Sequence, residues 1–317
     1  MTRFDVFNGD ADGLCALQQL RLDDPQEAVL VTGAKRDNAL LERVPAQAGD
    51  LVTALDIAMP GNRAALVALL GRGVRVRYVD HHEPGEVPDS PLLELTIDTS
   101  PDVCTSALAD RLVEGRQRPW AIVGCFGDNM NGTAQGLAAA LGLDDARRAR
   151  WQELGECLNY NAYGLSEEDL VYRPAQLYGA LSPYADPDRF IEQEPHFERL
   201  RQARSADLER ALECPAELLG RNAVLHLLPD AAWARRVSGS FANHALNADP
   251  ERAHAIATPR PGTGLLQVSL RLPRSSAASA HELVRPFGGG GRRGAAGIDA
   301  LDPSELPRLA ERLAALD

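Results

Sequence analysis

The chain has 317 residues, a net charge of −12 and an apolar fraction of 44%. This length exceeds the usual single-domain range, so we expect two domains. The acidic balance argues against a protein that coats long duplex nucleic acid, and no apolar run approaches the roughly 20 residues of a membrane span.

The cysteines and the first residues bear on the cellular compartment. Five scattered cysteines form no Cys-x-x-Cys pair, and the N-terminal residues lack the apolar core of a signal peptide. This pattern predicts reduced thiols and a cytoplasmic protein.

The first half of the chain alternates short apolar runs with stretches of helical spacing. This βαβ rhythm predicts an α/β fold with a mostly parallel sheet and helices on both of its faces. The expected strands are 4–7, 28–32, 51–57 and 74–79, and the expected helices are 14–22, 62–70, 104–113 and 120–126.

The second half begins with a largely helical pattern over 134–181, and the proline-containing segment 182–188 is the clearest break. We therefore expect a first domain at 1–185, a helical linker at 186–215 and a smaller α/β domain at 216–317. In that smaller domain we expect strands at 223–228, 253–257 and 265–272, helices at 235–246, 280–284 and 304–316, and a glycine-rich loop before the last helix.

Acidic side chains follow the expected elements. Residues 8–13 read Asn-Gly-Asp-Ala-Asp-Gly after the first strand, where Asp10 and Asp12 could each face one of two cations. The alternative is an acidic turn that caps the next helix. Asp56 ends the third strand among apolar neighbours, where a charge is costly unless it is paired or metal-bound; the alternative is a helix N-cap.

The fourth strand ends in the triplet Asp80, His81 and His82. A carboxylate and two imidazoles suit manganese, iron, cobalt or zinc. Asp128 follows a helix and by itself resembles an ordinary loop residue. Together, these positions would converge at the crevice of a parallel sheet and form the ligand set of a two-metal site for phosphoester hydrolysis.

In order and spacing, these motifs resemble the four motifs of the DHH phosphoesterase superfamily, and residues 8–13 look most like those of RecJ-type exonucleases. Independently, residues 237–243, 268–271 and 288–297 resemble the helix start, central strand and glycine-rich signature of the DHHA1 substrate-binding domain. The resemblance spans nearly the whole chain. It implies an N-terminal parallel-sheet DHH-type domain and a smaller C-terminal α/β domain of the DHHA1 type.

The resemblance also implies roles for individual residues. Two divalent cations, Mn2+ with Mg2+ or Co2+ as alternatives, would be held by five side chains with Asp56 bridging. Asp80 would orient the histidines, and His82 would lie against the scissile phosphate. The implied metal ligands are Asp10, Asp12, Asp56, His81 and Asp128, and the implied substrate-binding residues are Arg271, Gly289, Gly290, Gly291, Arg292 and Arg293.

The sequence departs from the family pattern at two positions. Asn8 stands where the family has His or Asp, which makes it a weaker metal ligand. Arg292 stands where the glycine-rich signature has His. Successive glycine N–H groups next to arginines still form an anion-binding site. A flexible hinge with solvated arginines is the alternative interpretation of this loop.

The function that follows is metal-dependent hydrolysis of short single-stranded oligonucleotides or small nucleotides such as dinucleotides and adenosine bisphosphate. Two alternatives remain open: a phosphomonoesterase or pyrophosphohydrolase acting on another nucleotide or polyphosphate, and a nucleotide sensor without turnover. We expect no membrane partner and no long duplex partner, and a homodimer is left open.

Overall fold

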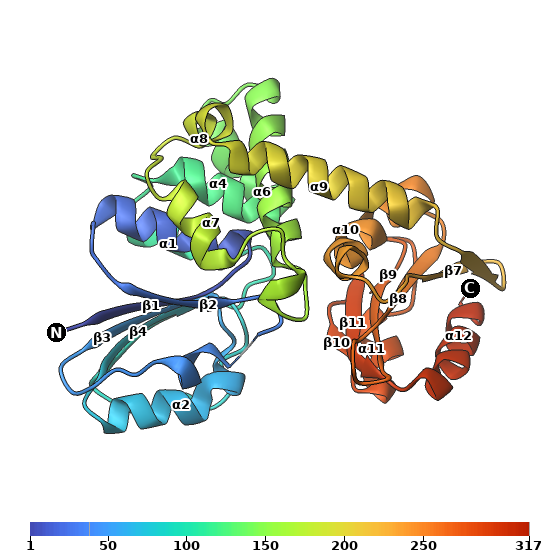
Figure 1. Ribbon diagram of the computed structural model, residues 1–317, viewed down its shortest axis with the longest axis horizontal. Coiled ribbons are helices and arrows are strands. Elements are labelled where there is room, and N and C mark those ends of the chain that lie inside the picture. The colour runs from blue at the N-terminus through green and yellow to red at the C-terminus, as the bar shows by residue number, and fades with distance from the viewer. Residues whose placement is uncertain (38, 317) are drawn as a thin grey trace. The chain divides into compact units, whose positions relative to one another are not determined.

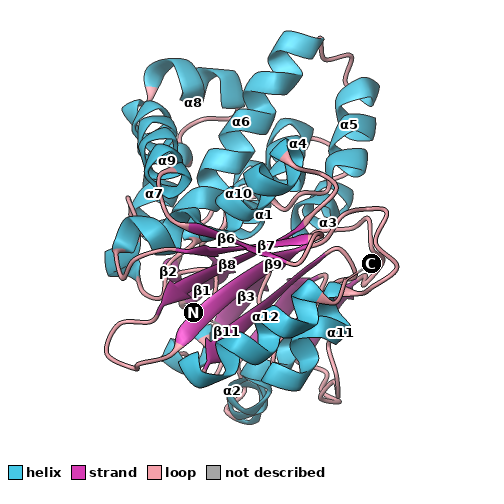
Figure 2. Cartoon of the chain, turned by 90° about the vertical axis from the view of Figure 1, so that its right-hand side faces the viewer, coloured by secondary structure: helices cyan, strands magenta, loops and turns pink. Residues whose placement is uncertain are grey.

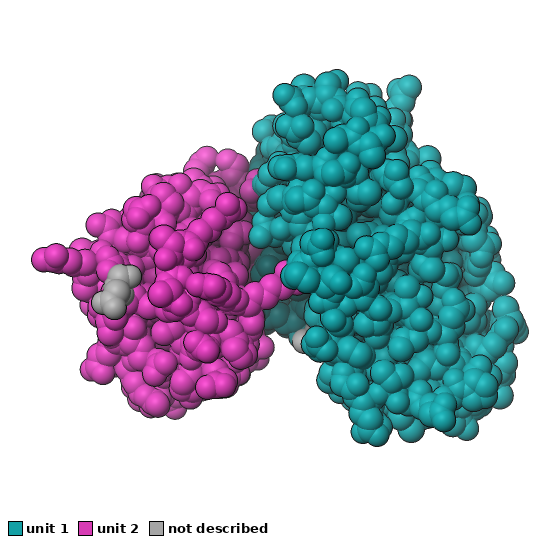
Figure 3. Space-filling view, turned by 180° about the vertical axis from the view of Figure 1, so that it is seen from behind, with its two compact units in different colours: residues 1–202 teal, residues 203–317 magenta. Residues whose placement is uncertain are grey.

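The computed structural model describes residues 1–37 and 39–316 and contains two compact units, Met1–Gln202 and Ala203–Asp317 (Figure 3). The division falls within α9 (Pro195–Leu212), inside the segment 186–215 that the sequence predicts as a helical linker. Each unit has its own sheet and its own hydrophobic core.

The first unit is built on a five-stranded sheet of order β2-β1-β3-β4-β5, in which every pairing is parallel. This architecture confirms the predicted α/β fold. The strands are β1 (Arg3–Asn8), β2 (Val29–Gly33), β3 (Leu51–Leu55), β4 (Arg75–Asp80) and β5 (Leu93–Ile97). No strand was predicted from the sequence at β5, an edge strand of five residues whose side chains are all partly or fully exposed.

Helices cover both faces of this sheet, with α1 on one side and α2 on the other (Figure 1). The alternation along β1 explains why: Phe4 and Val6 join the core beneath α2, whereas Phe7 joins the core beneath α1. The helices are α1 (Ala11–Asp23), α2 (Met59–Gly71), α3 (Thr105–Leu112), α4 (Arg118–Gly127), α5 (Asn131–Ala140), α6 (Asp145–Ala162), α7 (Pro174–Leu181) and α8 (Pro187–Gln193), with short 3₁₀ turns at Leu40–Arg43 and Glu167–Asp169.

The strand register places the functional motifs at one edge of the sheet. Asn8 pairs with Gly33, Phe7 with Leu55, and Leu55 with Val79. Because the strands are parallel, the segments that follow β1, β2, β3 and β4 all emerge at the same carboxyl edge. Ligand sites of open α/β sheets occur at this edge.

The second unit is a six-stranded mixed sheet of order β10-β11-β9-β8-β7-β6, in which only β7 and β8 are parallel. Helix α10 packs on one face through Val237 and Phe241, and α11 and α12 cover the other face. Figure 2 shows the strands and their covering helices in contrasting colours. The elements are β6 (Ala216–Leu219), β7 (Ala223–Leu227), α10 (Ala232–Ala248), β8 (Ala253–Pro259), β9 (Leu266–Arg271), α11 (Ala280–Val284), β10 (Gly290–Gly291), β11 (Ala295–Leu301) and α12 (Leu306–Ala314), with 3₁₀ turns at Arg285–Phe287 and Pro303–Glu305.

The sequence predicted a glycine-rich loop over residues 288–297, and the structure corrects this prediction. Gly290 pairs with Gly297 and Gly291 with Ala296, so the segment is a β-hairpin at the sheet edge. Glycine is a poor strand former, and its presence concealed the hairpin in the sequence. Within the described residues, no helix is both long enough and apolar enough to cross a membrane.

Glycines set the spacing of the helices above the sheet. A Cβ atom added to Gly127 at the end of α4 would lie 2.2 Å from the Cβ of Ala11 in α1 and 2.8 Å from the carbonyl oxygen of Gly155 in α6. Three helices therefore meet at one glycine, directly before Asp128.

We expect Gly127→Ala to lower the free energy of unfolding by about 1–3 kcal/mol, because the added methyl group must force α1 and α4 apart. Gly136→Ala in α5 is the matched control, since its Cβ would have no neighbour within 4 Å. That variant should gain up to about 1 kcal/mol. Urea denaturation of both variants tests this; equal stabilities would contradict the close packing of these helices.

Candidate active site

The turn after β1 holds the first two acidic side chains. Asp10 is the N-cap of α1, and its Oδ1 accepts hydrogen bonds from the backbone N–H groups of Asp12 (3.0 Å) and Gly13 (3.1 Å). The capping interpretation of this turn therefore holds for Asp10, and α1 begins at Ala11, earlier than expected. A Cβ on Gly13 would lie 2.2 Å from the carbonyl oxygen of Asn8, so this tight turn requires glycine.

Asp12 lies in the first turn of α1 and faces the N-terminus of α3. Its Oδ2 accepts a hydrogen bond from the backbone N–H of Thr105 (2.7 Å), and its Oδ1 accepts one from Ser106 (2.6 Å). The carboxylate is fully buried. The positive end of α3 thus stabilises its charge and fixes its orientation.

Asp56 follows β3 in a conformation that is rare for a residue with a side chain. Its φ is 56°, its N–H donates to the carbonyl of Val79 (3.1 Å), and its Oδ1 accepts a hydrogen bond from Thr105 Oγ1 (3.2 Å). Left-handed backbone at a non-glycine residue costs on the order of 1 kcal/mol. The fold tolerates this strain, and it aims a buried carboxylate at the sheet edge.

His81 occupies the centre of the acidic cluster. Its Nδ1 lies 2.9 Å from the carbonyl oxygen of Val103, an acceptor, so Nδ1 carries a proton and Nε2 is the nitrogen that faces the acidic cluster. Nε2 lies 3.5 Å from Asp56 Oδ1, 4.0 Å from Asp12 Oδ2 and 3.9 Å from Asp128 Oδ2. A histidine that donates from Nδ1 to a backbone carbonyl can bind a metal ion through Nε2.

His82 and Asp80 form a separate pair beside this centre. His82 Nδ1 donates to Asp80 Oδ1 (2.8 Å), and the His82 ring packs against His81 with a centroid distance of 4.5 Å. Burial on its own would lower the pKa of His82, but the hydrogen bond and charge of Asp80 raise it above its usual value. The second oxygen of the buried Asp80 has no hydrogen-bond partner among the described residues.

Asp128 caps the C-terminal end of α4 and connects His81 to a residue that no sequence motif marks. Its Oδ1 lies 3.7 Å from the Nζ of Lys35, which also forms an ion pair with Asp10. Lys35 follows β2 at the same sheet edge. Its position just after a predicted strand of the parallel sheet could have identified it as a site residue.

The electrostatics of the cluster single out Asp56. Burial raises its pKa well above the usual range, and the negative charges of Asp10 and Asp12 raise it further. Burial also raises the pKa of Asp128, and the charge of Lys35 offsets part of that shift. For Asp10, burial acts in the same direction, but Lys35 lowers the pKa overall. Asp56 therefore carries the least compensated charge.

These donors fit a divalent cation. Three carboxylate oxygens lie 3.5–4.0 Å from His81 Nε2, a spacing compatible with a nitrogen and an oxygen that each lie about 2.1 Å from an ion. Two groupings of ligand atoms within 4.8 Å of one another are present: Asp12, His81 and Asp128, and Asp56, His81 and His82.

The structure thus brings together the predicted residues of the first unit but gives Asn8 another task. Its Oδ1 accepts a hydrogen bond from the N–H of Asp10 (3.2 Å), and its Nδ2 donates to the carbonyl of Lys35 (3.4 Å). Both ends of the Asn8 amide are engaged inside the turn, which argues against its predicted role as a metal ligand.

The predicted substrate-binding residues belong to the second unit and lie on neighbouring strands. Arg271 ends β9, is paired in register with Ala295 and donates to Asn243 Oδ1 (2.6 Å). Arg292 and Arg293 are exposed at the hairpin turn. Gly289 and Gly291 are closely packed, since an added Cβ would lie 2.7 Å from Val284 and 2.5 Å from Ala296, whereas Gly290 is open.

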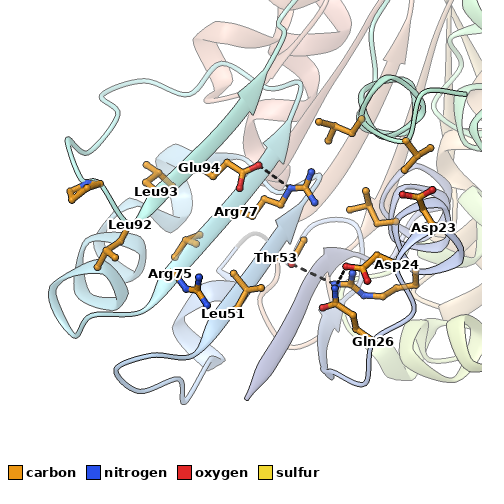
Figure 4. A pocket seen from close by; sticks show the side chains of 16 residues that line it. Asp23, Asp24, Gln26, Leu51, Thr53, Arg75, Arg77, Leu92, Leu93 and Glu94 are labelled. Atoms are coloured by element: carbon orange, nitrogen blue, oxygen red, sulfur yellow. Dashed lines mark hydrogen bonds and ion pairs between the residues drawn. The ribbon is translucent and has the colours of Figure 1, made fainter. Parts of the chain in front are cut away.

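A hollow of about 400 Å³ lies at the opposite edge of the first sheet (Figure 4). It is lined by the amino ends of β3, β4 and β5, and its Arg77 pairs with Glu94 at 3.3 Å. None of the predicted site residues lines it. The acidic cluster, and not this hollow, is therefore the candidate active site.

Known structures share this fold. The protein is similar to the exonuclease RecJ bound to manganese (TM-score 0.64, 22% identity, 99% of this chain and 89% of that chain). It is also similar to a DHH domain from a member of a family of ribosomal proteins (TM-score 0.65, 13% identity, 99% of this chain and 85% of that chain). The third is PggH, the pGpG-specific phosphodiesterase from Vibrio cholerae (TM-score 0.54, 16% identity, 99% of this chain and 98% of that chain).

At these identities the similarity establishes the fold alone, which the protein shares with these RecJ, DHH-domain and phosphodiesterase structures. The predicted α/β fold, with a parallel first sheet and a second α/β unit, is thereby confirmed. No protein-family model matches the sequence, and no curated protein matches it significantly.

We expect Asp12→Ala to destabilise the protein even without metal. It leaves the buried N–H groups of Thr105 and Ser106 without their acceptor, which costs about 1–3 kcal/mol for each group. Denaturation in the presence of chelator measures this. Asp128→Ala is the control, because it removes a carboxylate of the same cluster, and an equal loss in both variants would contradict the structural role of Asp12.

Proposed function

We propose that this protein is a metal-dependent phosphoesterase. The observation that carries the proposal is the position of His81 Nε2, which the hydrogen bond from Nδ1 to Val103 aims at oxygens of Asp12, Asp56 and Asp128. The proposed function needs one divalent ion at this position. Mn2+ is the proposed ion because imidazole and carboxylate donors suit it, and the similar RecJ structure is bound to manganese.

A bound ion of this kind activates a water molecule at neutral pH and polarises a phosphoryl oxygen. The residues of this chain supply the rest. Asp56 and His81 hold their donor atoms in place through the backbone at Val79 and Val103. His82, kept protonated to higher pH by Asp80, donates its remaining N–H to a phosphate oxygen of the substrate.

The proposed substrates are short oligonucleotides and small nucleotides, including linear dinucleotides and adenosine bisphosphate. Similarity to an exonuclease and to a pGpG-specific phosphodiesterase supports this class. The acidic net charge argues against long duplexes as substrates. Arg271, Arg292 and Arg293 are proposed to bind substrate phosphates, since two of them are exposed on a glycine hairpin and the third lies on the adjacent strand.

A phosphomonoesterase or polyphosphate hydrolase is the second candidate. Arg292 in place of histidine favours additional phosphate groups, and the structure of an exopolyphosphatase-related protein from Bacteroides fragilis shares the fold (TM-score 0.52, 13% identity). A substrate panel with Mn2+ and with chelator separates the candidates. The panel contains a dinucleotide, a five-residue RNA, adenosine 3′,5′-bisphosphate, a dinucleoside polyphosphate and polyphosphate. Binding of any of these compounds without metal-dependent cleavage would indicate a sensor.

Asp56→Ala and His81→Ala should each reduce hydrolysis to the background rate, because each removes a donor that the ion needs. Steady-state rates on the best substrate of the panel measure the effect. Asp145→Ala is the control, an exposed carboxylate on α6 paired only with Arg148 among the ion pairs described. Normal turnover in Asp56→Ala or His81→Ala would refute the proposed metal position.

Arg292→Ala should raise KM by about 10-fold or more and leave kcat nearly unchanged, because a lost charged hydrogen bond to phosphate costs about 1.5–3 kcal/mol. Arg312→Ala on the exposed side of α12 is the matched control. An unchanged KM in Arg292→Ala would exclude this arginine from substrate binding.

A further inference from the structure

The chain contains a single lysine. Of its 33 lysine and arginine residues, only Lys35 is a lysine, and it lies in the acidic cluster. Arginine serves at every other basic position. A lysine ammonium is compact and directs three donors tetrahedrally, whereas a guanidinium is a wide planar fork. The use of lysine at this one place indicates that the position requires the smaller cation.

The backbone around Lys35 is fixed by two other elements. Its N–H donates to the carbonyl of Ala162 at the end of α6 (2.9 Å), and its own carbonyl accepts the Asn8 amide (3.4 Å). Because Asn8 and Gly33 are paired in register, Lys35 and Asp10 emerge side by side from β2 and β1. The side chain is three-quarters buried, at 25% exposure.

The ammonium group contacts three oxygen-bearing side chains. Nζ forms an ion pair with Asp10, lies 3.7 Å from Asp128 Oδ1 and donates to Asn159 Oδ1 at 3.5 Å. Its distance to the centroid of the Tyr163 ring is 5.7 Å. Two carboxylates and an amide oxygen around one positive centre are the environment of a cation site.

The residues around Lys35 leave few donors for a second metal ion. One oxygen of Asp10 caps α1 and the other pairs with Lys35. Both polar groups of the Asn8 amide are engaged within the turn. A second ion beside Asp10 would therefore have to displace the Lys35 ammonium, whereas the ion beside His81 would not.

We propose that the Lys35 ammonium takes the second cation position of this site, so that the protein binds one divalent ion per chain instead of the two predicted from the sequence. Lys35 supplies a fixed single charge and N–H donors next to Asp10 and Asp128. The inference rests on the proposed function only for the assignment of this cluster as the active site.

Manganese stoichiometry of the whole 317-residue chain tests the proposal. Equilibrium dialysis with Mn2+ should give one tightly bound ion per chain, with the electron paramagnetic resonance spectrum of an isolated Mn2+. Lys35→Met removes the charge and nearly keeps the length of the side chain. This variant should bind a second ion and show the exchange coupling of two ions about 3.5–4 Å apart.

Two coupled ions in the unmodified protein would overturn the proposal, and so would a single ion in both the unmodified protein and a folded Lys35→Met variant. If Lys35→Met does not fold, the Mn2+ affinity of Asp10→Asn tests the proposal instead. This variant should fold, because asparagine still caps α1. That variant should keep its Mn2+ affinity within about threefold, whereas His81→Ala should lose more than about 100-fold. An equal loss in Asp10→Asn would make Asp10 a metal ligand and contradict the assignment.

The outcome is separable from that of the proposed function. A protein that hydrolyses the substrate panel with two bound ions would keep the phosphoesterase function and refute the role of Lys35. A protein that binds one ion but cleaves no member of the panel would keep the role of Lys35 and refute the phosphoesterase function.

Discussion

The concentration of negative charge at the carboxyl edge of one parallel sheet is the constraint on which the rest of the structure depends. Five aspartates meet there, four of them almost fully buried: Asp10, Asp12, Asp56, Asp80 and Asp128. Buried charges of one sign are destabilising unless each has a compensating partner. The fold provides such partners for some of these aspartates, and the candidate site lies where the compensation is weakest.

Each partner comes from a different element. The N-terminus of α3 compensates Asp12, and Lys35 together with the N-terminus of α1 compensates Asp10. His82 compensates Asp80. What remains is Asp56, which receives a hydrogen bond from the Thr105 hydroxyl and has a pKa raised well above its usual range, with His81 Nε2 and Asp128 beside it. These carboxylates and His81 Nε2 are the groups at which the proposed cation would bind.

Much of this arrangement could be predicted from the sequence, because strand ends in a parallel sheet converge by geometry alone. The placement of Asp10, Asp56 and His81 at one edge follows from where the apolar runs end. The partners of these residues could not be predicted, since they depend on tertiary contacts between segments far apart in the chain, as between Asp12 and Thr105. Lys35 was missed because no motif marks it, although its uniqueness in the sequence was visible.

In the second unit, the motif was recognised in the sequence but its conformation was not predicted correctly. The glycine-rich signature was predicted to be a loop, and the structure shows a hairpin of β10 and β11. Glycine has no strand preference that would mark β10 in the sequence, and β11 is held in the sheet by its pairing with β9. The hairpin nevertheless exposes Arg292 and Arg293 at its turn, where their positive charges are accessible to an anion.

In the proposed site His81 binds Mn2+, and electron spin-echo modulation of the Mn2+-loaded protein detects such a bond by counting bound imidazole nitrogens. We expect coupling to one histidine nitrogen, which disappears in His81→Ala and persists in His82→Ala. Coupling to no histidine nitrogen would contradict the metal site, and coupling to two would make His82 a ligand instead of a donor to the substrate phosphate.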